Sequence, residues 1–389
     1  MVYDPAKQKH HYVPQFFFRL FEENGHVEVY DVTEKRFHPG SCRDLSFIRN
    51  FYEYPAIEEV FSKIDTASKD ALWKLLNNKK FEILTIAEKV NVFRFLVFQH
   101  MRTPKAKDKY EKFFKFITNE LIKDLFRKNI GKKSFITKEW VENGAMPTIE
   151  GPIFLTTLLN TLIEGHFYMA DLVPVILINK TNKDFLFGDD PVIFYNSFFN
   201  YVNDLDMTCL FSPGLQIFSP LDSKTMLMLY DPKFYRAKNI SVSKDVQGLP
   251  TGVINIIQGS DIDALNALQF LNCEKSIYFL DKNQSTYIEG LHSSLDAYVK
   301  PKMYGSSTYT FENKSPELGK ELSEFYIKGN VGYQLSLSFM PFLPYPGKTE
   351  MIGYGGFPIR SAESMQRIKM VTEQMYKNMR RKTCREKLL

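Results

Sequence analysis

The chain of 389 residues is poor in cysteine and tryptophan, with four of the first and two of the second. The cysteines are far apart and form no Cys-x-x-Cys pair, which disfavours both a zinc ribbon and a disulfide scaffold. Reduced thiols fit a cytosolic compartment. No window approaches the roughly 18 uncharged apolar residues that a membrane span needs. The opening "MVYDPAKQKHHYV" also lacks the apolar core of a leader peptide, so we expect a cytoplasmic protein without a membrane partner.

Several familiar catalytic signatures are missing as well. The "GKKS" at 131–134 is not a phosphate loop, because Phe126 stands where the first glycine is required. The "GYGGFP" at 353–358 lacks the strand-then-helix context of a dinucleotide fingerprint. The chain contains no H-E-x-x-H, no G-x-S-x-G and no zinc deaminase signature. Common nucleotide, hydrolase and zinc-protease chemistries are therefore disfavoured.

Apolar and basic residues are abundant. Hydrophobic residues make up 44% of the chain and aromatic residues 15%, which is enough for a packed interior. The net charge is only +5, but residues 102–133 hold 11 Lys/Arg against 4 Asp/Glu, and residues 360–387 hold 9 against 3. Such basic segments suit an anionic partner such as nucleic acid. The ordinary alternative is two helices with solvated charged faces. The oligomeric state is left open.

The periodicity predicts an α+β fold. A short hairpin is expected over "HVEVYDVTEKRFHPG", and apolar stripes at helical spacing run over 57–75, 86–101 and 110–125. Another helix is expected in "GPIFLTTLLNTLIEGHFYMADL". From Val173 short β-branched runs follow one another too closely for parallel crossovers, so they predict a mainly antiparallel sheet. "DIDALNALQFLNCEKSIYF" then predicts a return to helix.

We therefore expect a helical N-terminal half packed on a mainly antiparallel sheet, in a chain long enough for two domains. The first would span 8–285. The second, 286–389, would be a C-terminal elaboration that ends in a basic amphipathic helix over 361–382.

Two adjacent histidines begin the first segment that could carry chemistry, "QKHHYVPQFFFRLF". Pro14 is suited to the start of a helical turn that buries Phe17 and Phe21, so His10 and His11 stand just before that turn. An imidazole near neutral pH can act as a base, an acid or a metal ligand. Alternatively, one ring hydrogen-bonds to the backbone and only borders the apolar patch.

The second segment, "FQHMRTP", ends the helix over 86–101, because Pro104 disfavours helical geometry in the residue before it. Gln99 and Arg102 flank the apolar stripe, and Arg102 could bind a phosphate or a carboxylate with its planar fork. An arginine in the last turn also complements the helix dipole. His100, on the apolar face, is more easily explained as a core residue with its hydrogen bonds satisfied.

The third segment is "FLFGDDPVIFY", where two strand-like runs meet at a turn. Turn chemistry accounts for it, with Gly188 supplying a positive φ, aspartate bonding to the backbone and Pro191 fixing φ. Asp189 and Asp190 are also a plausible seat for a divalent metal or a general base, because loops held by a sheet often carry function.

These segments and the later "FSPLDSKTMLML" occur in an order that resembles the family described as domain of unknown function 4238, whose members open with a His-Tyr-Val-Pro motif. The likeness covers roughly residues 8 to 280. The family pattern has a Ser/Thr-Asp-Asn-Pro turn, so Asp189 matches its aspartate and Asp190 departs from it. Gln99, Arg102 and Pro220 also match residues of the same kind in the family pattern. The resemblance implies a shared fold and assigns no activity.

Two hypotheses follow. The first is a metal-dependent hydrolase of phosphodiesters that acts on nucleic acid. In it His11 would be a base or metal ligand, Asp189 a metal ligand helped by Asp190, and Arg102 the clamp on developing charge, with His10 and Gln99 beside them. The basic helix over 105–128 would follow the nucleic acid backbone. The second hypothesis is a binding or sensing protein in which the same groups line a ligand site without chemistry.

Overall fold

The computed structural model describes residues 9–52, 55–112, 115, 158–159, 165–198, 200, 208–238, 240–245, 248, 250–296, 298, 304–309, 322–327, 333–343, 352–354 and 357–360. Helices and strands are both present, and the fold is α+β. None of the helices in these residues combines the length and the apolar character that a bilayer crossing requires.

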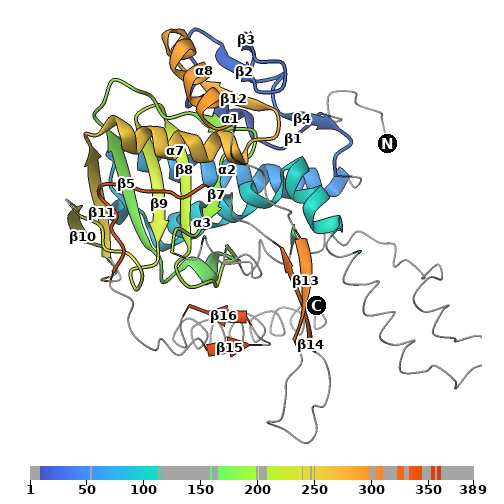
Figure 1. The fold of residues 1–389 in the computed structure, drawn as a ribbon. Helices are drawn as coiled ribbons and strands as arrows, with labels where there is room; N and C mark the ends of the chain where they lie inside the picture. Colours follow the sequence, from blue (N-terminus) through green and yellow to red (C-terminus); the bar gives the residue numbers. More distant parts are fainter. Residues whose placement is uncertain are drawn as a thin grey trace, which may run out of the picture.

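A six-stranded mixed sheet lies at the centre, in the order β10-β11-β5-β9-β8-β7 (Figure 1). Its neighbours are antiparallel except β11 and β5, which pair in parallel. Strands β5, β8 and β9 are apolar along most of their length because both faces of the sheet are covered. The strands are β5 (Val173–Asn179), β7 (Ile193–Tyr195), β8 (Gln216–Asp222), β9 (Thr225–Tyr230), β10 (Ile240–Lys244) and β11 (Pro250–Ile256).

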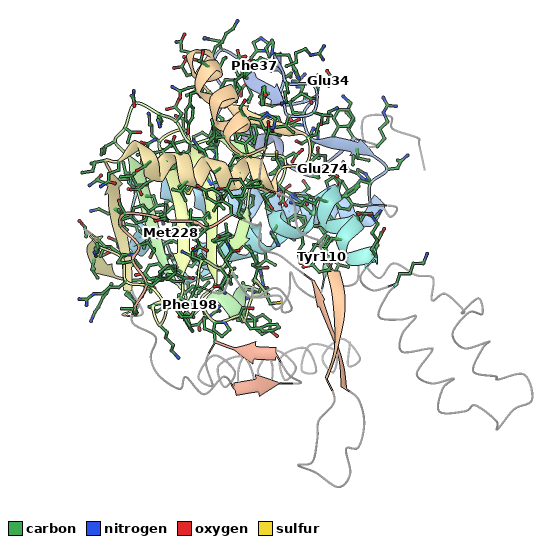
Figure 2. All side chains as sticks on the ribbon, viewed as in Figure 1. Glu34, Phe37, Tyr110, Phe198, Met228 and Glu274 are labelled. Carbon is green, nitrogen blue, oxygen red and sulfur yellow. The ribbon has the colours of Figure 1, made fainter. Side chains whose placement is uncertain are left out.

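Helices cover the two faces of this sheet. α2 (Pro55–Asn78) and α3 (Ile86–Met101) lie on one face and α7 (Gly259–Asn272) on the other (Figure 1). Successive strand residues point to opposite faces, so Ile176 joins the core beneath α2 and α3 while Val175 joins the core beneath α7. Met228, labelled in Figure 2, belongs to this second core. The two cores hold the sheet rigidly between helical layers.

The boundaries of α3 follow from its sequence. Thr85 accepts a bond from the Glu88 amide, and the Glu88 side chain accepts one from the Thr85 amide, which forms a capping box. The helix ends at Met101, and Arg102 is its C-cap, two residues before Pro104. The short helix α1 (Gln15–Phe18) begins after Pro14, as its fixed φ allows. It buries Phe17 and Phe21 against the first core.

A smaller antiparallel sheet, in the order β3-β2-β12-β6, lies beside the central one. Its strands are β2 (Val27–Asp31), β3 (Arg36–Gly40), β6 (Phe187–Gly188) and β12 (Ser276–Phe279). Strand β1 (Lys9–His11) pairs with β4 (Phe47–Arg49). The 3-10 helices in the described part of the chain are η2 (Phe81–Ile83), η3 (Gly165–Met169) and η4 (Lys282–Gln284). β6 continues directly into the Asp189–Asp190 turn, so the small sheet positions that turn.

Segments beyond residue 285 pack on the same body. α8 (Ser285–Ser294) follows η4, and Leu335, Leu337, Phe339 and Met340 belong to the core beneath α7. The strands β13 (Tyr304–Tyr309) and β14 (Leu322–Ile327) pair with each other, as do β15 (Ile352–Tyr354) and β16 (Phe357–Ile359). The domain boundary expected at residue 285 stays a prediction. Leu335, Leu337, Phe339 and Met340, which follow it, nevertheless belong to the core of what comes before.

Most elements expected from periodicity are present, and two expectations are wrong. "CEKSIYF" does not continue the helix, because α7 ends at Asn272 and Ser276–Phe279 forms strand β12. Gly188 has no positive φ. Glycine is needed there for space, since a Cβ would lie 2.8 Å from the Cys273 Cβ. The helices expected over 110–125 and 361–382 lie mostly or wholly outside the described residues.

Candidate functional site

The three segments singled out in the sequence meet at Tyr12. Gln99 Nε2, on α3, donates a hydrogen bond to the Tyr12 carbonyl at 2.9 Å. Burial, and then the charge of Asp189, raises the pKa of Tyr12 to about 12, and Phe17 of the first segment packs on Phe187 of the third with ring centroids 5.3 Å apart. The fold therefore brings the His-Tyr-Val-Pro, Gln-His-Met-Arg and Gly-Asp-Asp-Pro segments against one another.

Arg102 is the most deeply buried charge in this region, at 1% exposure. Its Nε donates to Gln99 Oε1 at 2.8 Å, and its Nη1 donates to Asp65 Oδ2 at 3.0 Å. The guanidinium also lies 4.4 Å from the centre of the Phe98 ring. The ion pair with Asp65 uses one nitrogen and one oxygen only, so each partner keeps a polar atom that the pair does not satisfy.

Three polar atoms around this ion pair are buried and have no hydrogen-bond partner: Tyr52 Oη, Asp65 Oδ1 and Arg102 Nη2. Buried polar groups are bonded in nine cases of ten or more, so three such atoms at one ion pair need an explanation. We call the group that surrounds this ion pair the Arg102 cluster; it comprises His11, Tyr52, Glu58, Asp65, Gln99 and Arg102.

The cluster borders solvent on the side of α2. The Asp65 side chain is 23% exposed although its Oδ1 is buried, and Glu58 and His11 are half-buried. Burial raises the pKa of Asp65 and of Glu58, and the charge of Arg102 opposes both shifts. The cluster thus holds two carboxyl groups that protonate more readily than usual, beside one fixed cation.

His11 lies at the edge of the cluster on β1. Its Nε2 is 3.2 Å from the Arg43 carbonyl, which can only accept, and 3.5 Å from Gln15 Nε2, which can only donate. Burial lowers the pKa of His11, and the charges of Lys9 and Arg102 lower it further, against the opposing effect of the Arg43 carbonyl. His11 is therefore neutral near pH 7, which suits a base or a hydrogen-bonding group.

His10 points to the opposite side of β1 and supports Tyr52. Its Nδ1 accepts a hydrogen bond from the Tyr52 amide at 3.1 Å, and the two rings stack with centroids 5.4 Å apart. His10 is only 6% exposed. Its place in the fold is to position the tyrosine whose hydroxyl lacks a partner.

The Asp189 carboxylate is occupied by backbone donors. Oδ1 accepts from the amide of Glu274 at 2.8 Å, and Oδ2 accepts from the amides of Lys275 and Ser276 at 2.7 and 3.0 Å. Figure 2 labels Glu274, the first residue of this turn. Asp189 is 5% exposed, and burial raises its pKa while these three bonds oppose the shift. Its carboxylate ties the turn after β6 to the turn after α7.

Asp190 is buried beside Lys105, whose Nζ lies 4.0 Å from its Oδ2. The backbone carbonyl of Asp190 accepts a bond from Asn272 Nδ2, and its Oδ1 has no partner. Burial raises the pKa of Asp190 to about 7, and the charge of Asp189 adds to this. No group of three or more His, Cys, Asp or Glu side chains in the described residues is placed to hold a metal ion.

His100 lies away from the cluster, on the sheet side of α3. Its ring stacks on Phe194 with centroids 4.0 Å apart, and its Nδ1 bonds to the Val192 carbonyl at 3.0 Å. Burial lowers its pKa to about 3. These contacts explain His100 as part of the packing.

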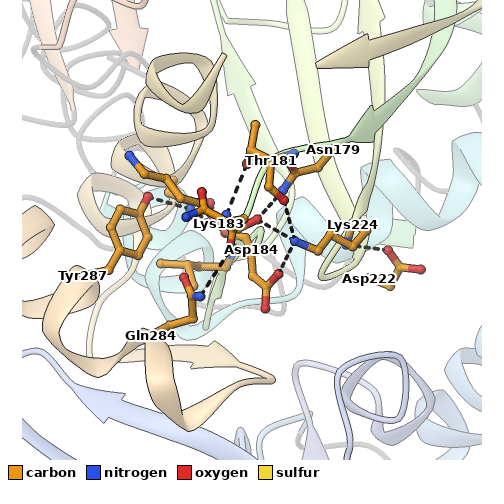
Figure 3. A network of polar contacts seen from close by, with 11 residues as sticks. Asn179, Thr181, Lys183, Asp184, Asp222, Lys224, Gln284 and Tyr287 are labelled. Carbon is orange, nitrogen blue, oxygen red and sulfur yellow. Dashed lines mark hydrogen bonds and ion pairs between the residues drawn. The ribbon is translucent and has the colours of Figure 1, made fainter. Parts of the chain in front are cut away.

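A second polar centre, at the loop after β5, contrasts with the Arg102 cluster (Figure 3). Lys224 Nζ donates to the carbonyls of Thr181 and Lys183 at 3.0 and 2.8 Å and pairs with Asp184 at 2.7 Å. Asn179 Nδ2 also donates to the Lys183 carbonyl, at 2.6 Å. These polar groups bond to one another. The network joins the loop to the β8–β9 turn, and this structural role is enough to explain it.

The sequence reading missed Tyr52, Glu58 and Asp65. A signal for Asp65 was present, because it stands four residues after Phe61 and seven before Leu72, on the buried stripe of α2. An acid on an apolar helix face is rarely buried without a partner. Tyr52 and Glu58 gave no comparable signal.

Comparison with known proteins agrees with this picture of the motifs. No curated protein and no solved structure matches the chain. One family model does match, over residues 9–283, and it contains all three segments that meet at Tyr12. The chain therefore belongs to the family described as protein of unknown function DUF4238.

Proposed function

We propose that this chain binds a polar ligand at the Arg102 cluster. The observation that carries the proposal is the set of three buried atoms without partners, Tyr52 Oη, Asp65 Oδ1 and Arg102 Nη2. Leaving a buried polar atom unpaired costs about 1 to 3 kcal/mol, more for a charged group. A ligand that completes the hydrogen bonds of these three atoms would explain why the fold keeps them around one ion pair.

The chemistry of these atoms limits the ligand. Arg102 Nη2 can only donate, and an ionised Asp65 Oδ1 can only accept, while the Tyr52 hydroxyl can do both. The complementary group places an acceptor beside a donor, as a carboxamide or the edge of a nucleobase does. A simple anion offers acceptors alone, and it would meet the carboxyl groups of Asp65 and Glu58.

Thermal unfolding with small probes tests this proposal. Nicotinamide and uridine carry the expected edge, and dimethyl phosphate carries acceptors only. We expect nicotinamide or uridine to raise the melting temperature of the wild-type chain, since a ligand at a hundred times its Kd adds about 2.7 kcal/mol. Dimethyl phosphate should have little effect.

The matched variant is Tyr52→Phe, which removes one unpaired hydroxyl and keeps the ring that stacks on His10. Its affinity for the active probe should fall about tenfold, the equivalent of 1.4 kcal/mol. The proposal fails if no probe shifts the wild-type melting temperature, or if Tyr52→Phe responds as the wild type does.

A second function, hydrolysis of a phosphodiester, has its own support. His11 is a neutral base whose pKa the charge of Arg102 lowers, and Lys105 and Lys107 lie three and five residues after Arg102, at the start of the basic segment. In this proposal His11 takes a proton from water and Arg102 stabilises the developing charge. The Asp189 carboxylate accepts three backbone hydrogen bonds and does not fit a metal site, so no step is assigned to a metal.

The same protein preparations separate the two functions. Single- and double-stranded DNA and RNA are incubated with Mg²⁺ or Mn²⁺ and the wild-type chain or His11→Ala. Hydrolysis requires cleavage by the wild type that His11→Ala abolishes without lowering the melting temperature. Absence of cleavage together with a response to nicotinamide or uridine supports binding alone.

A further inference from the structure

Arg94 and His166 form a separate pair of polar side chains away from the Arg102 cluster. Arg94 lies on α3 and His166 on η3, two elements that pack against each other. Arg94 Nε and His166 Nδ1 are both buried and have no hydrogen-bond partner. His166 is 4% exposed and its ring lies 3.8 Å from that of Phe167, whereas the Arg94 side chain is partly exposed.

No anionic side chain of the described residues pairs with Arg94 or His166. The two deeply buried arginines of the described residues each have one, since Arg102 pairs with Asp65 and Arg360 pairs with Asp171. Among the residues that the structure describes, Arg94 has no acidic partner. Burial lowers the pKa of Arg94, and burial followed by the charge of Arg94 lowers the pKa of His166 to about 4. A cation in a partly desolvated place is costly without a counter-charge.

We propose that Arg94 and His166 bind a small oxyanion, such as phosphate or a carboxylate, between α3 and η3. One oxygen accepts the Nε–H of Arg94 and another approaches Nδ1 of His166. Because Nδ1 then faces a negative charge, His166 takes up a proton and donates it as a second charge-assisted bond. Burial, followed by the charge of Arg94, keeps the ring of His166 neutral before the anion binds.

This proton uptake fixes the sign of the pH dependence. The pKa of His166 is about 4 without the anion and higher with it. Affinity for the anion therefore increases as pH falls from 7 towards 4 and becomes constant below that value. The internal alternative is that Arg94 Nε–H bonds to His166 Nδ1 after a small shift, in which case no anion is needed.

Calorimetric titration with inorganic phosphate at pH 7, 6 and 5 tests the proposal, and acetate in parallel tests a carboxylate source. We expect binding that strengthens as pH falls. Arg94→Met should weaken it about tenfold, the effect of losing one charge-assisted hydrogen bond. The control is Arg236→Met, which removes an exposed arginine and should bind as the wild type does.

A second measurement uses the wild-type chain alone, in case Arg94→Met does not fold. The NMR titration of the His166 ring should give a higher pKa with phosphate than without it. The absence of phosphate and acetate binding, equal binding by Arg94→Met and the wild type, or a His166 pKa that phosphate leaves unchanged would each overturn the proposal in favour of the direct Arg94–His166 bond.

Discussion

Replacing Arg360 with methionine should lower the free energy of unfolding by about 3 to 5 kcal/mol, the effect of breaking a buried ion pair. Arg360 follows β16 and is 5% exposed. Its Nε contacts both oxygens of Asp171 at 3.0 and 2.9 Å, and its other nitrogens donate to the carbonyls of Tyr168, Leu210 and Ser212. Methionine keeps part of the volume and leaves Asp171 and these carbonyls without the guanidinium.

Urea unfolding monitored by circular dichroism measures this effect, and Arg236→Met is the control. Arg236 is exposed, so its replacement should change the stability by less than about 0.5 kcal/mol. A loss below about 1 kcal/mol in Arg360→Met would show that the segment around β16 contributes little to the stability of the body on which it packs.

Asp189→Asn should lower the free energy of unfolding by about 3 kcal/mol, because its carboxylate accepts three backbone hydrogen bonds. An asparagine amide has one acceptor oxygen, so at least one of these N–H groups would face another donor. The two turns that Asp189 joins would then separate more easily. Denaturant unfolding again provides the measurement.

The control for Asp189 is Asp281→Asn. Asp281 is half-buried and caps η4 by accepting one bond from the Asn283 amide, and asparagine caps about as well as aspartate. The two variants should therefore differ by about 3 kcal/mol in stability. If Asp189→Asn unfolds like the wild type but loses cleavage of nucleic acid in the presence of metal, Asp189 has the catalytic role that the sequence suggested.

The main elements of the fold were predictable because their periodicity is strong. The apolar stripe of α3 and the Pro104 that follows it predicted the bounds of that helix closely. The β-branched runs after Val173 predicted the central strands. The failure at "SIYF" has a physical reason. Four residues after a helix are too few to show the alternation of apolar and polar residues that predicts a strand. Strand β12 forms because β2 and β6 flank it.

The candidate site was only partly predictable. Motif reading found His11, Gln99 and Arg102, and the fold places them together. It also named Asp189, whose bonds to the turn at 274–276 depend on contacts distant in sequence. Tyr52 and Glu58 joined the cluster through tertiary packing, which a local pattern does not encode. Whether a polar group is satisfied depends on its partners and becomes visible only in the structure.

The most direct test of the account compares two tyrosine hydroxyls. Tyr52 and Tyr278 are both buried, but Tyr52 Oη has no partner whereas Tyr278 Oη lies 2.8 Å from Ser46 Oγ. If the Arg102 cluster is a site awaiting a ligand, Tyr52→Phe should raise the unfolding free energy of the ligand-free chain by about 1 kcal/mol, and Tyr278→Phe should lower it by about 1 kcal/mol. Equal destabilisation by both would show that the Tyr52 hydroxyl is already bonded, for example to an ordered water, and would contradict the account.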